Sequence, residues 1–389
     1  MDHWVPSRDY ISKFWKQDIK TVVRILGELR SETEFNNFTF YTKWYTNGIK
    51  SELPYLSNHP EASNMRTGNE WGRSIIEHLH GMGVSVGAMI QFLTYENRVW
   101  EEELSIGEME LGHVAETELP VRIADITNPL FRKRFKAIIK EHLAQFPALD
   151  YLFLEFEGLH WGDVQLVYDI WTRQSGTPNA ESLTYEDEVL DHCKRIGVAP
   201  SLIWSKEAKR MLTHYYGLNL QAAKEVLDEM KYEGIVGIVI HSYGYETFIY
   251  PELLPDPDWW LVSWNYWNCE NESDETEQKK AISKEKMLQW KRDGHKVCYI
   301  GDVTIGAEHG SDMQAKKEVV RDFYDFSVKY ELDGYLGMGN PVPDIGLKWI
   351  GVTDDHVLQM REFYSELYGR GTMNWKLDSK GESGGESSC

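Results

Sequence analysis

Short apolar runs recur along the chain, and most of them are followed by a longer stretch with helical periodicity. Eight runs have the length and the aromatic or β-branched content of strands. Strands that alternate with helices fold into a parallel sheet covered by helices. The pattern therefore predicts an α/β fold, a (β/α)8 or TIM barrel. The alternative is an open doubly wound sheet, but no GxGxxG or phosphate-binding loop follows an early strand. The expected strands are 38–45, 84–93, 150–157, 197–204, 234–241, 259–265, 296–302 and 333–339.

We expect a single catalytic domain over residues 1–375, with long loops after its strands. Residues 9–30 carry apolar residues at helical spacing and predict an extra helix before the first strand. Residues 94–124 are acidic and show no clear periodicity, so we expect an irregular loop there. Asn128 and Pro129 are typical of a helix start. Residues 376–389 are rich in Ser and Gly and predict a disordered tail.

The run at 150–157 ends in two acids, Glu155 and Glu157. Alternate residues of a strand lie on opposite faces, so these two share one face, with Cα atoms roughly 6.6 Å apart. An unpaired acid on a buried strand face costs several kcal/mol. Two such neighbours are expected where a strand opens to water or a substrate, or where Arg or Lys from adjacent strands pairs with them.

Polar and aromatic residues also follow the other predicted strands. The active site of a (β/α)8 barrel lies at the carboxyl ends of its strands, so these residues are candidates for substrate binding. Nearly all of them can hydrogen-bond a hydroxyl group or stack on a sugar ring. They are Lys43, Trp44, Gln91, Trp204, His241, Tyr243, Glu246, Trp264, Asn265, Asp302 and Asn340.

The composition narrows the choice of partner. A net charge of −21 disfavours nucleic acids and anionic membranes, because both repel a chain of that charge. The sequence contains no run of about 18 apolar residues, so it predicts no membrane span. Fifteen Trp and twenty-one Tyr favour a carbohydrate ligand, whose rings pack on flat apolar faces. The N-terminus has no signal region, which fits a cytoplasmic protein or an exported one whose leader has been removed.

Glycoside hydrolysis needs two carboxyl groups in different protonation states. Two acids close together raise the pKa of one of them, which keeps a Glu protonated near neutral pH. Glu157, at the end of its strand and followed by Gly158, is the expected proton donor, and Glu155 is its neighbour in the site. The second carboxylate is either Asp302 or Glu246.

Residues Asp150 to Glu157 resemble the strand of family-eighteen chitinases in which spaced acids on one face end in a catalytic Glu. The stretch is also similar to barrel hexosaminidases and α-glucuronidases. The resemblance implies that Glu157 is the proton donor, that Glu155 stands where chitinases have an Asp that steers the acetamido group, and that Asp150 matches the first acid. Phe153 replaces another acid. The resemblance covers eight of the 389 residues and leaves the family open.

The sequence thus predicts a glycosidase without a metal or other cofactor. A Lys43-dependent lyase or aldolase is the first alternative, because a lysine at a strand end can form a Schiff base. The second is a barrel that binds sugar without catalysis. His78 and His80 resemble a metal-binding pair, but residues two apart on a helix face different ways.

Overall fold

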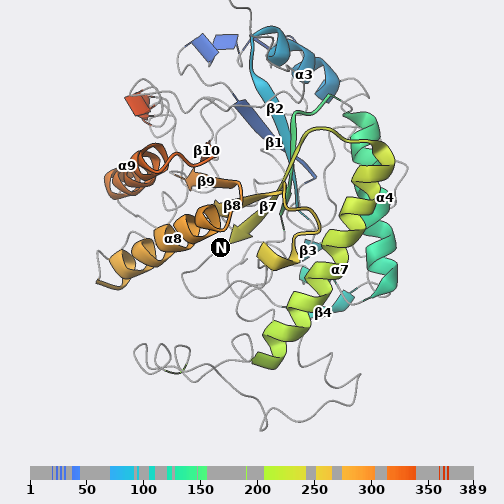
Figure 1. Cartoon of the computed structure of the whole chain (residues 1–389). Coiled ribbons are helices and arrows are strands. Elements are labelled where there is room, and N and C mark those ends of the chain that lie inside the picture. The colour runs from blue at the N-terminus through green and yellow to red at the C-terminus, as the bar shows by residue number, and fades with distance from the viewer. Residues whose placement is uncertain are drawn as a thin grey trace, which may run out of the picture.

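A computed structural model of the chain describes residues 20, 23–24, 27–28, 30–31, 37–43, 71–91, 94–95, 105–109, 121–124, 128–146, 148–155, 190, 206–241, 251–264, 274–302, 313–338, 359, 362–363 and 366–367. Seven parallel strands form its main sheet, in the order in which they occur along the chain. They lie at the centre of Figure 1 with the helices around them, and they form a half-barrel. The strands are β1 (Asn37–Lys43), β2 (Ser85–Gln91), β6 (Tyr151–Glu155), β7 (Ile235–His241), β8 (Trp260–Trp264), β9 (Val297–Asp302) and β10 (Gly334–Met338).

The strands are staggered as those of a barrel are. The first residue of each strand pairs either with the first residue of the preceding strand or with a residue nearer that strand's carboxyl end. The shift is two residues at the β2–β6 and β7–β8 steps, one residue at β8–β9 and β9–β10, and none at β1–β2 and β6–β7. The six steps add up to six residues, an average of one per step and all in one direction, as in a sheet that curls toward a barrel. Closure by an eighth strand stays a prediction.

Five long helices within the described residues accompany the sheet. They are α3 (Trp71–Gly81), α4 (Pro129–Gln145), α7 (Lys206–Met230), α8 (Asp274–Arg292) and α9 (Met313–Lys329), and a 3-10 turn, η4, covers Pro251–Leu253. The predicted start of α4 is confirmed. The Asn128 side chain accepts a hydrogen bond from the Leu130 backbone N–H at 2.8 Å, and Pro129 occupies the first helical position. No helix among the residues described above has an apolar stretch long enough to cross a membrane.

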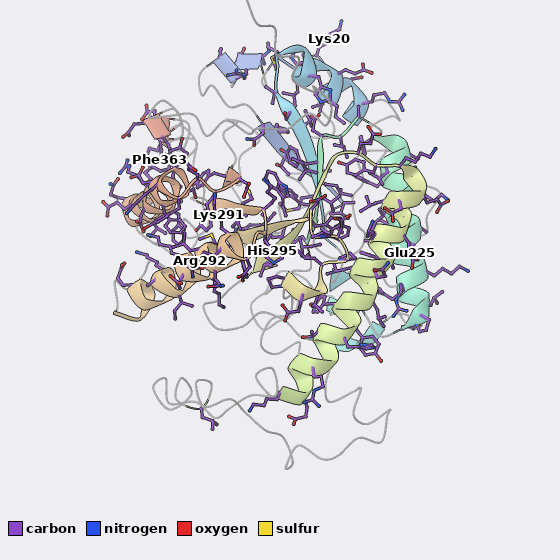
Figure 2. All side chains as sticks on the ribbon, in the orientation of Figure 1. Lys20, Glu225, Lys291, Arg292, His295 and Phe363 are labelled. Atoms are coloured by element: carbon purple, nitrogen blue, oxygen red, sulfur yellow. The ribbon has the colours of Figure 1, made fainter. Side chains whose placement is uncertain are left out.

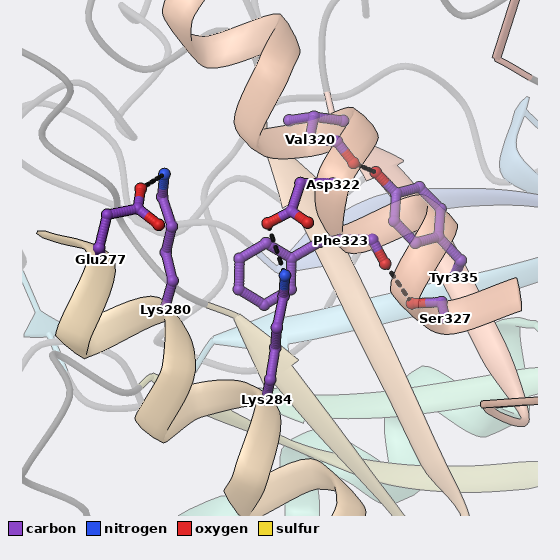
Figure 3. A network of polar contacts seen from close by, with 8 residues as sticks. All are labelled: Glu277, Lys280, Lys284, Val320, Asp322, Phe323, Ser327 and Tyr335. Atoms are coloured by element: carbon purple, nitrogen blue, oxygen red, sulfur yellow. Dashed lines mark hydrogen bonds and ion pairs between the residues drawn. The ribbon is translucent and has the colours of Figure 1, made fainter. Parts of the chain in front are cut away.

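The outer face of the sheet packs against the helices. Tyr299 of β9 stacks on Phe323 of α9, with ring centroids 4.4 Å apart and planes 7° apart. Lys284 of α8 lies 5.0 Å from the centre of the Phe323 ring and pairs with Asp322 at 2.5 Å, which ties α8 to α9 (Figure 3). The register places Leu154 of β6 on the face that carries Tyr299.

The opposite, inner face of β6 carries Tyr151, Phe153 and Glu155, and all three are buried. The two aromatic rings lie over glycines of the neighbouring strands. A Cβ atom on Gly87 would lie 1.8 Å from the Tyr151 ring, and one on Gly237 would lie 2.7 Å from the Phe153 ring. These rings fill the interior of the half-barrel beneath Glu155.

The Tyr151 ring reaches across β2 to β1. Its hydroxyl group is 2.7 Å from the Thr39 hydroxyl oxygen. Burial raises the pKa of Tyr151, and the Cys298 thiol on β9 adds to the increase. Because three strand-to-strand steps separate β6 from β9, this electrostatic effect agrees with a sheet that curls around its inner face.

Helices α4 and α7 pack side by side on one flank of the sheet. Lys136 of α4 and Glu225 of α7, which is labelled in Figure 2, form an ion pair at 2.6 Å. Both side chains are exposed, so the pair adds little stability. Nearby on α4, His142 is fully buried against Phe146, with ring centroids 4.9 Å apart. Burial lowers the pKa of His142 to about 3.

Two expectations are corrected. The stretch at 94–124 is not simply an irregular loop, because it contains a three-stranded antiparallel sheet in the order β3-β5-β4. Its strands are β3 (Thr94–Tyr95), β4 (Ser105–Met109) and β5 (Val121–Ala124). In addition, β6 pairs directly with β7 along five residue pairs, so no strand from 197–204 lies between them. Residues 197–204 and the tail at 376–389 are outside the described residues.

Candidate functional site

The connections of the main sheet differ greatly between its two edges. Helices lead into strands through short turns, at 82–84, 146–150, 231–234, 293–296 and 330–333. Beyond the carboxyl ends of the strands, β2 is joined to α4 by 92–128, and β6 is joined to α7 by 156–205. Long connections in such folds carry binding and catalytic residues. The carboxyl edge is therefore the candidate functional site.

Six of the candidate residues end their strands. Each is the last residue of a strand in the main sheet: Lys43, Gln91, Glu155, His241, Trp264 and Asp302. β10 ends at Met338, a position that the sequence-based candidates missed. Seven candidates lie outside the described residues: Glu157, Trp44, Trp204, Tyr243, Glu246, Asn265 and Asn340.

The register gives five of these strand ends one face. Gln91 pairs with Glu155 on the neighbouring strand, and Glu155 pairs with Val239. Two residues further along β7, His241 pairs with Trp264. Trp264 pairs with Ile300, which is two residues before Asp302. Residues paired across adjacent strands, or two apart within one, share a face. The five positions therefore belong to the inner face, above Tyr151 and Phe153.

Lys43 is the exception among the strand ends. The β1–β2 ladder pairs Tyr41 with Met89 and then Lys43 with Ile90, so β1 carries one extra residue at a β-bulge. Bulges often occur beside active sites, where they change the direction of a side chain. Ile90 belongs to the outer-face series of β2, so the register does not place Lys43 beside Gln91 and Glu155.

Glu155 and Trp264 are both fully buried at this edge, with 0% exposure. Glu155 is the only acid among the buried residues that the structure describes. Removing a carboxyl group from water costs several kcal/mol unless other groups compensate. Glu155 therefore lies at this edge among groups that compensate for its loss of hydration.

Asp150 lies at the other end of β6 and has a structural role. Its carboxylate accepts a hydrogen bond from the Val86 backbone N–H at 2.7 Å and lies 2.8 Å from His80 Nε2. The contacts join β6 to β2 and α3 at the amino edge. The resemblance matched Asp150 to the first acid of the strand, and in the structure Asp150 directly precedes β6, at the amino edge of the sheet.

Asp333 forms a parallel contact before β10. It accepts a hydrogen bond from the Val297 backbone N–H at 2.9 Å and pairs with Lys296 at 3.1 Å. Asp150 and Asp333 thus each join the start of one strand to the start of its neighbour. Within the described part of the chain, no three His, Cys, Asp or Glu side chains gather as a metal site requires.

The chain resembles known proteins in structure but not in sequence. No protein-family model matches the chain, and no curated protein matches it. A beta-glycosidase structure covers 95% of each chain at 12% identity, with a TM-score of 0.50. A Flavobacterium johnsoniae chitobiase matches 91% of this chain and 49% of its own, at 12% identity and a TM-score of 0.48.

A cycloisomaltooligosaccharide glucanotransferase from Paenibacillus also matches, over 73% of this chain and 36% of its own, at 9% identity and a TM-score of 0.43. The chain thus spans less than half the length of the chitobiase and of the glucanotransferase. The likeness to the beta-glycosidase, which covers nearly all of both chains, shows a shared α/β fold.

Proposed function

We propose that the protein is a glycoside hydrolase whose site lies at the carboxyl edge of the main sheet. The observation that carries the proposal is the position of Glu155. Glu155 is a fully buried acid on the inner face and the last residue of β6. It pairs in register with Gln91, the last residue of β2. The fold shared with a beta-glycosidase agrees with this class of enzyme by analogy of fold alone.

Glu157 is the proposed general acid. It follows Glu155 by two residues, so if the alternation of β6 continues, both acids face the same side. A protonated Glu157 would transfer its proton to the oxygen of the leaving group as the glycosidic bond breaks. Glu155, held beside it, would orient this carboxyl group and keep it protonated through charge repulsion.

The second half of the reaction needs a group on the other side of the sugar ring. Asp302 ends β9 on the inner face, and Glu246 follows β7, so both are proposed as the base or nucleophile. If the substrate carries an acetamido group that takes this part, no protein nucleophile is needed. We assign sugar binding to the other strand-end candidates: Lys43, Trp44, Gln91, Trp204, His241, Tyr243, Trp264, Asn265 and Asn340.

A screen of wild-type protein against aryl glycosides tests the enzyme class. The panel covers α- and β-linked glucose, galactose, mannose, xylose, N-acetylglucosamine and glucuronic acid. We expect release of the aryl group from at least one sugar, without an added cofactor. Borohydride treatment with carbonyl substrates tests the Lys43 alternative, because it traps a Schiff base. Covalent trapping at Lys43 together with no glycoside turnover would replace the glycosidase by a lyase.

A further inference from the structure

The connection between β7 and β8 ends in a segment of turns that lies beside α7 (Figure 1). We call this segment, residues 251–259, the strap. It begins with η4, and its backbone forms a further turn in which the Trp259 N–H donates to the Asp256 carbonyl oxygen at 3.1 Å. The next two connections of the sheet contain the helices α8 and α9 instead. Three of the nine residues of the strap are proline, which fixes φ and stiffens the segment.

Two contacts join the strap to α7. Leu253 packs on the backbone of the helix, where a Cβ atom on Gly217 would lie 3.4 Å from its Cδ2 atom. Seven residues further along α7, Lys224 Nζ lies 3.4 Å from Asp256 Oδ2 and 2.8 Å from Asp228 Oδ1. The hydrogen bond to Asp228 raises the pKa of Lys224, and Asp256 adds to the increase. Lys224 is therefore a charged link between the strap and α7.

The first contact lies near the carboxyl edge of the main sheet. α7 ends at Met230 and leads through the turn at 231–234 into β7, so its last residue is at the amino edge. Gly217 is 13 residues before Met230, which is about 20 Å of helix. The seven residues of β7 also span about 20 Å. The strap therefore meets Gly217 at about the level where β7 ends, and it passes Lys224 on the way to the start of β8.

The strap divides the connection into two parts. Nine residues, 242–250, join β7 to η4, whereas the whole connection, 242–259, has eighteen. The first part contains the candidates Tyr243 and Glu246. The number of arrangements open to a tethered segment grows as about the 3/2 power of its length, so halving the length favours any one arrangement by about three-fold. A strap held on α7 therefore limits the arrangements of the segment that carries Glu246.

We infer that Lys224 and Leu253 are positioning residues, which hold the strap on α7 and thereby order residues 242–250 for the reaction. The inference rests on the proposed function, in which Tyr243 binds the sugar and Glu246 is a candidate for the base or nucleophile. The effect of Lys224 and Leu253 is transmitted through the chain that joins η4 to β7.

Hydrogen exchange measured by mass spectrometry tests the hold of the strap. Lys224→Met removes the charge but keeps the aliphatic stem, and Leu253→Ala removes the apolar contact. Lys140→Met is the matched control, because Lys140 pairs with Glu229 and joins α7 to α4 instead. We expect residues 242–250 to exchange about three-fold faster in Lys224→Met and Leu253→Ala than in wild type, and at the wild-type rate in Lys140→Met. Wild-type exchange of 242–250 in both strap variants would overturn the inference.

Initial rates with an aryl glycoside that the wild type cleaves test the link to the reaction. We expect kcat to fall about three-fold in Lys224→Met and Leu253→Ala and to remain unchanged in Lys140→Met. Lys224→Arg, which keeps the charge, should restore both kcat and the exchange of 242–250. Faster exchange together with wild-type kcat would overturn the positioning role. If the wild type cleaves no glycoside, the proposed function fails, while faster exchange of 242–250 in the two strap variants alone still supports the ordering of this segment by the strap.

Discussion

Gln91 and Glu155 are the last residue pair of the ladder between β2 and β6, and both end their strands. The other in-register neighbour of Glu155 is Val239, which cannot hydrogen-bond through its side chain. Glu155 is thus flanked on the neighbouring strands by the positions of Gln91 and Val239. Below this level it is aromatic, at Tyr151 and Phe153.

Glu155→Gln tests whether the buried acid serves catalysis. The amide has nearly the shape of the carboxyl group, so we expect a change in unfolding free energy of about 1 kcal/mol. If Glu155 orients and polarises Glu157, kcat should fall by about 100-fold or more, and the pH–rate profile should shift because one charge is lost. Thermal denaturation and initial rates across pH measure both effects. A variant with wild-type kcat would show that Glu155 is structural.

Gly87→Ala tests how tightly the inner face is packed. The added Cβ would lie 1.8 Å from the Tyr151 ring, so the ring or the β2 backbone has to move. We expect a loss of about 3 kcal/mol in the free energy of unfolding, measured by urea denaturation. Gly81→Ala is the matched control. Gly81 ends α3 with no atom within 4 Å of an added Cβ, and alanine favours a helix, so stability should be unchanged or higher.

The lowered pKa of His142 predicts a loss in the free energy of unfolding in mild acid. Its pKa is about 3 in the folded chain and about 6.5 when unfolded. Because the folded pKa is the lower one, the unfolded chain binds the proton more readily, and stability falls as the pH drops below about 6.5. The loss at pH 5 should be about 2 kcal/mol relative to pH 7.5. Urea denaturation of wild type and His142→Leu at both pH values measures it. An equal loss in the variant would assign the effect to other groups.

Asp150→Asn and Asp333→Asn test the contacts at the amino edge. Each carboxylate accepts a backbone N–H of the neighbouring strand. Charge-assisted hydrogen bonds of this type contribute about 1–3 kcal/mol, so each variant should lose stability in that range while kcat remains as in wild type. Their hydrogen bonds join different pairs of strands, β2–β6 and β9–β10, so their effects should add in the double variant. A selective fall in kcat for Asp150→Asn would contradict a purely structural role for Asp150.

The sequence predicts the elements of the fold better than it predicts their neighbours. The apolar runs become seven parallel strands, and the Asn128–Pro129 start of α4 is confirmed, because periodicity and capping are local properties. The run at 197–204 looked like a strand of the barrel, yet β6 pairs directly with β7. Pairing depends on contacts distant in sequence, which a short apolar run does not specify.

The candidate site shows the same limit. Alternation along β6 is enough to group Glu155 with Tyr151 and Phe153, but its full burial depends on residues from other strands. A β-bulge pairs Lys43 with Ile90. The bulge depends on how β1 and β2 pair, and a local sequence pattern does not specify this pairing. The small sheet at 94–124 was missed because its strands, of two to five residues, are too short for periodicity to detect.

The rate of glycoside hydrolysis by Glu157→Gln, compared with wild type and with Glu233→Gln, tests the central claim most directly. Glu233 is an exposed acid in the turn before β7, at the opposite edge of the sheet, so its variant makes the same chemical change away from the site. With an aryl glycoside that the wild type cleaves, Glu157→Gln should reduce kcat by about 10²–10⁴-fold and Glu233→Gln should leave it unchanged. Equal rates for all three proteins would contradict the assignment of Glu157 as the general acid.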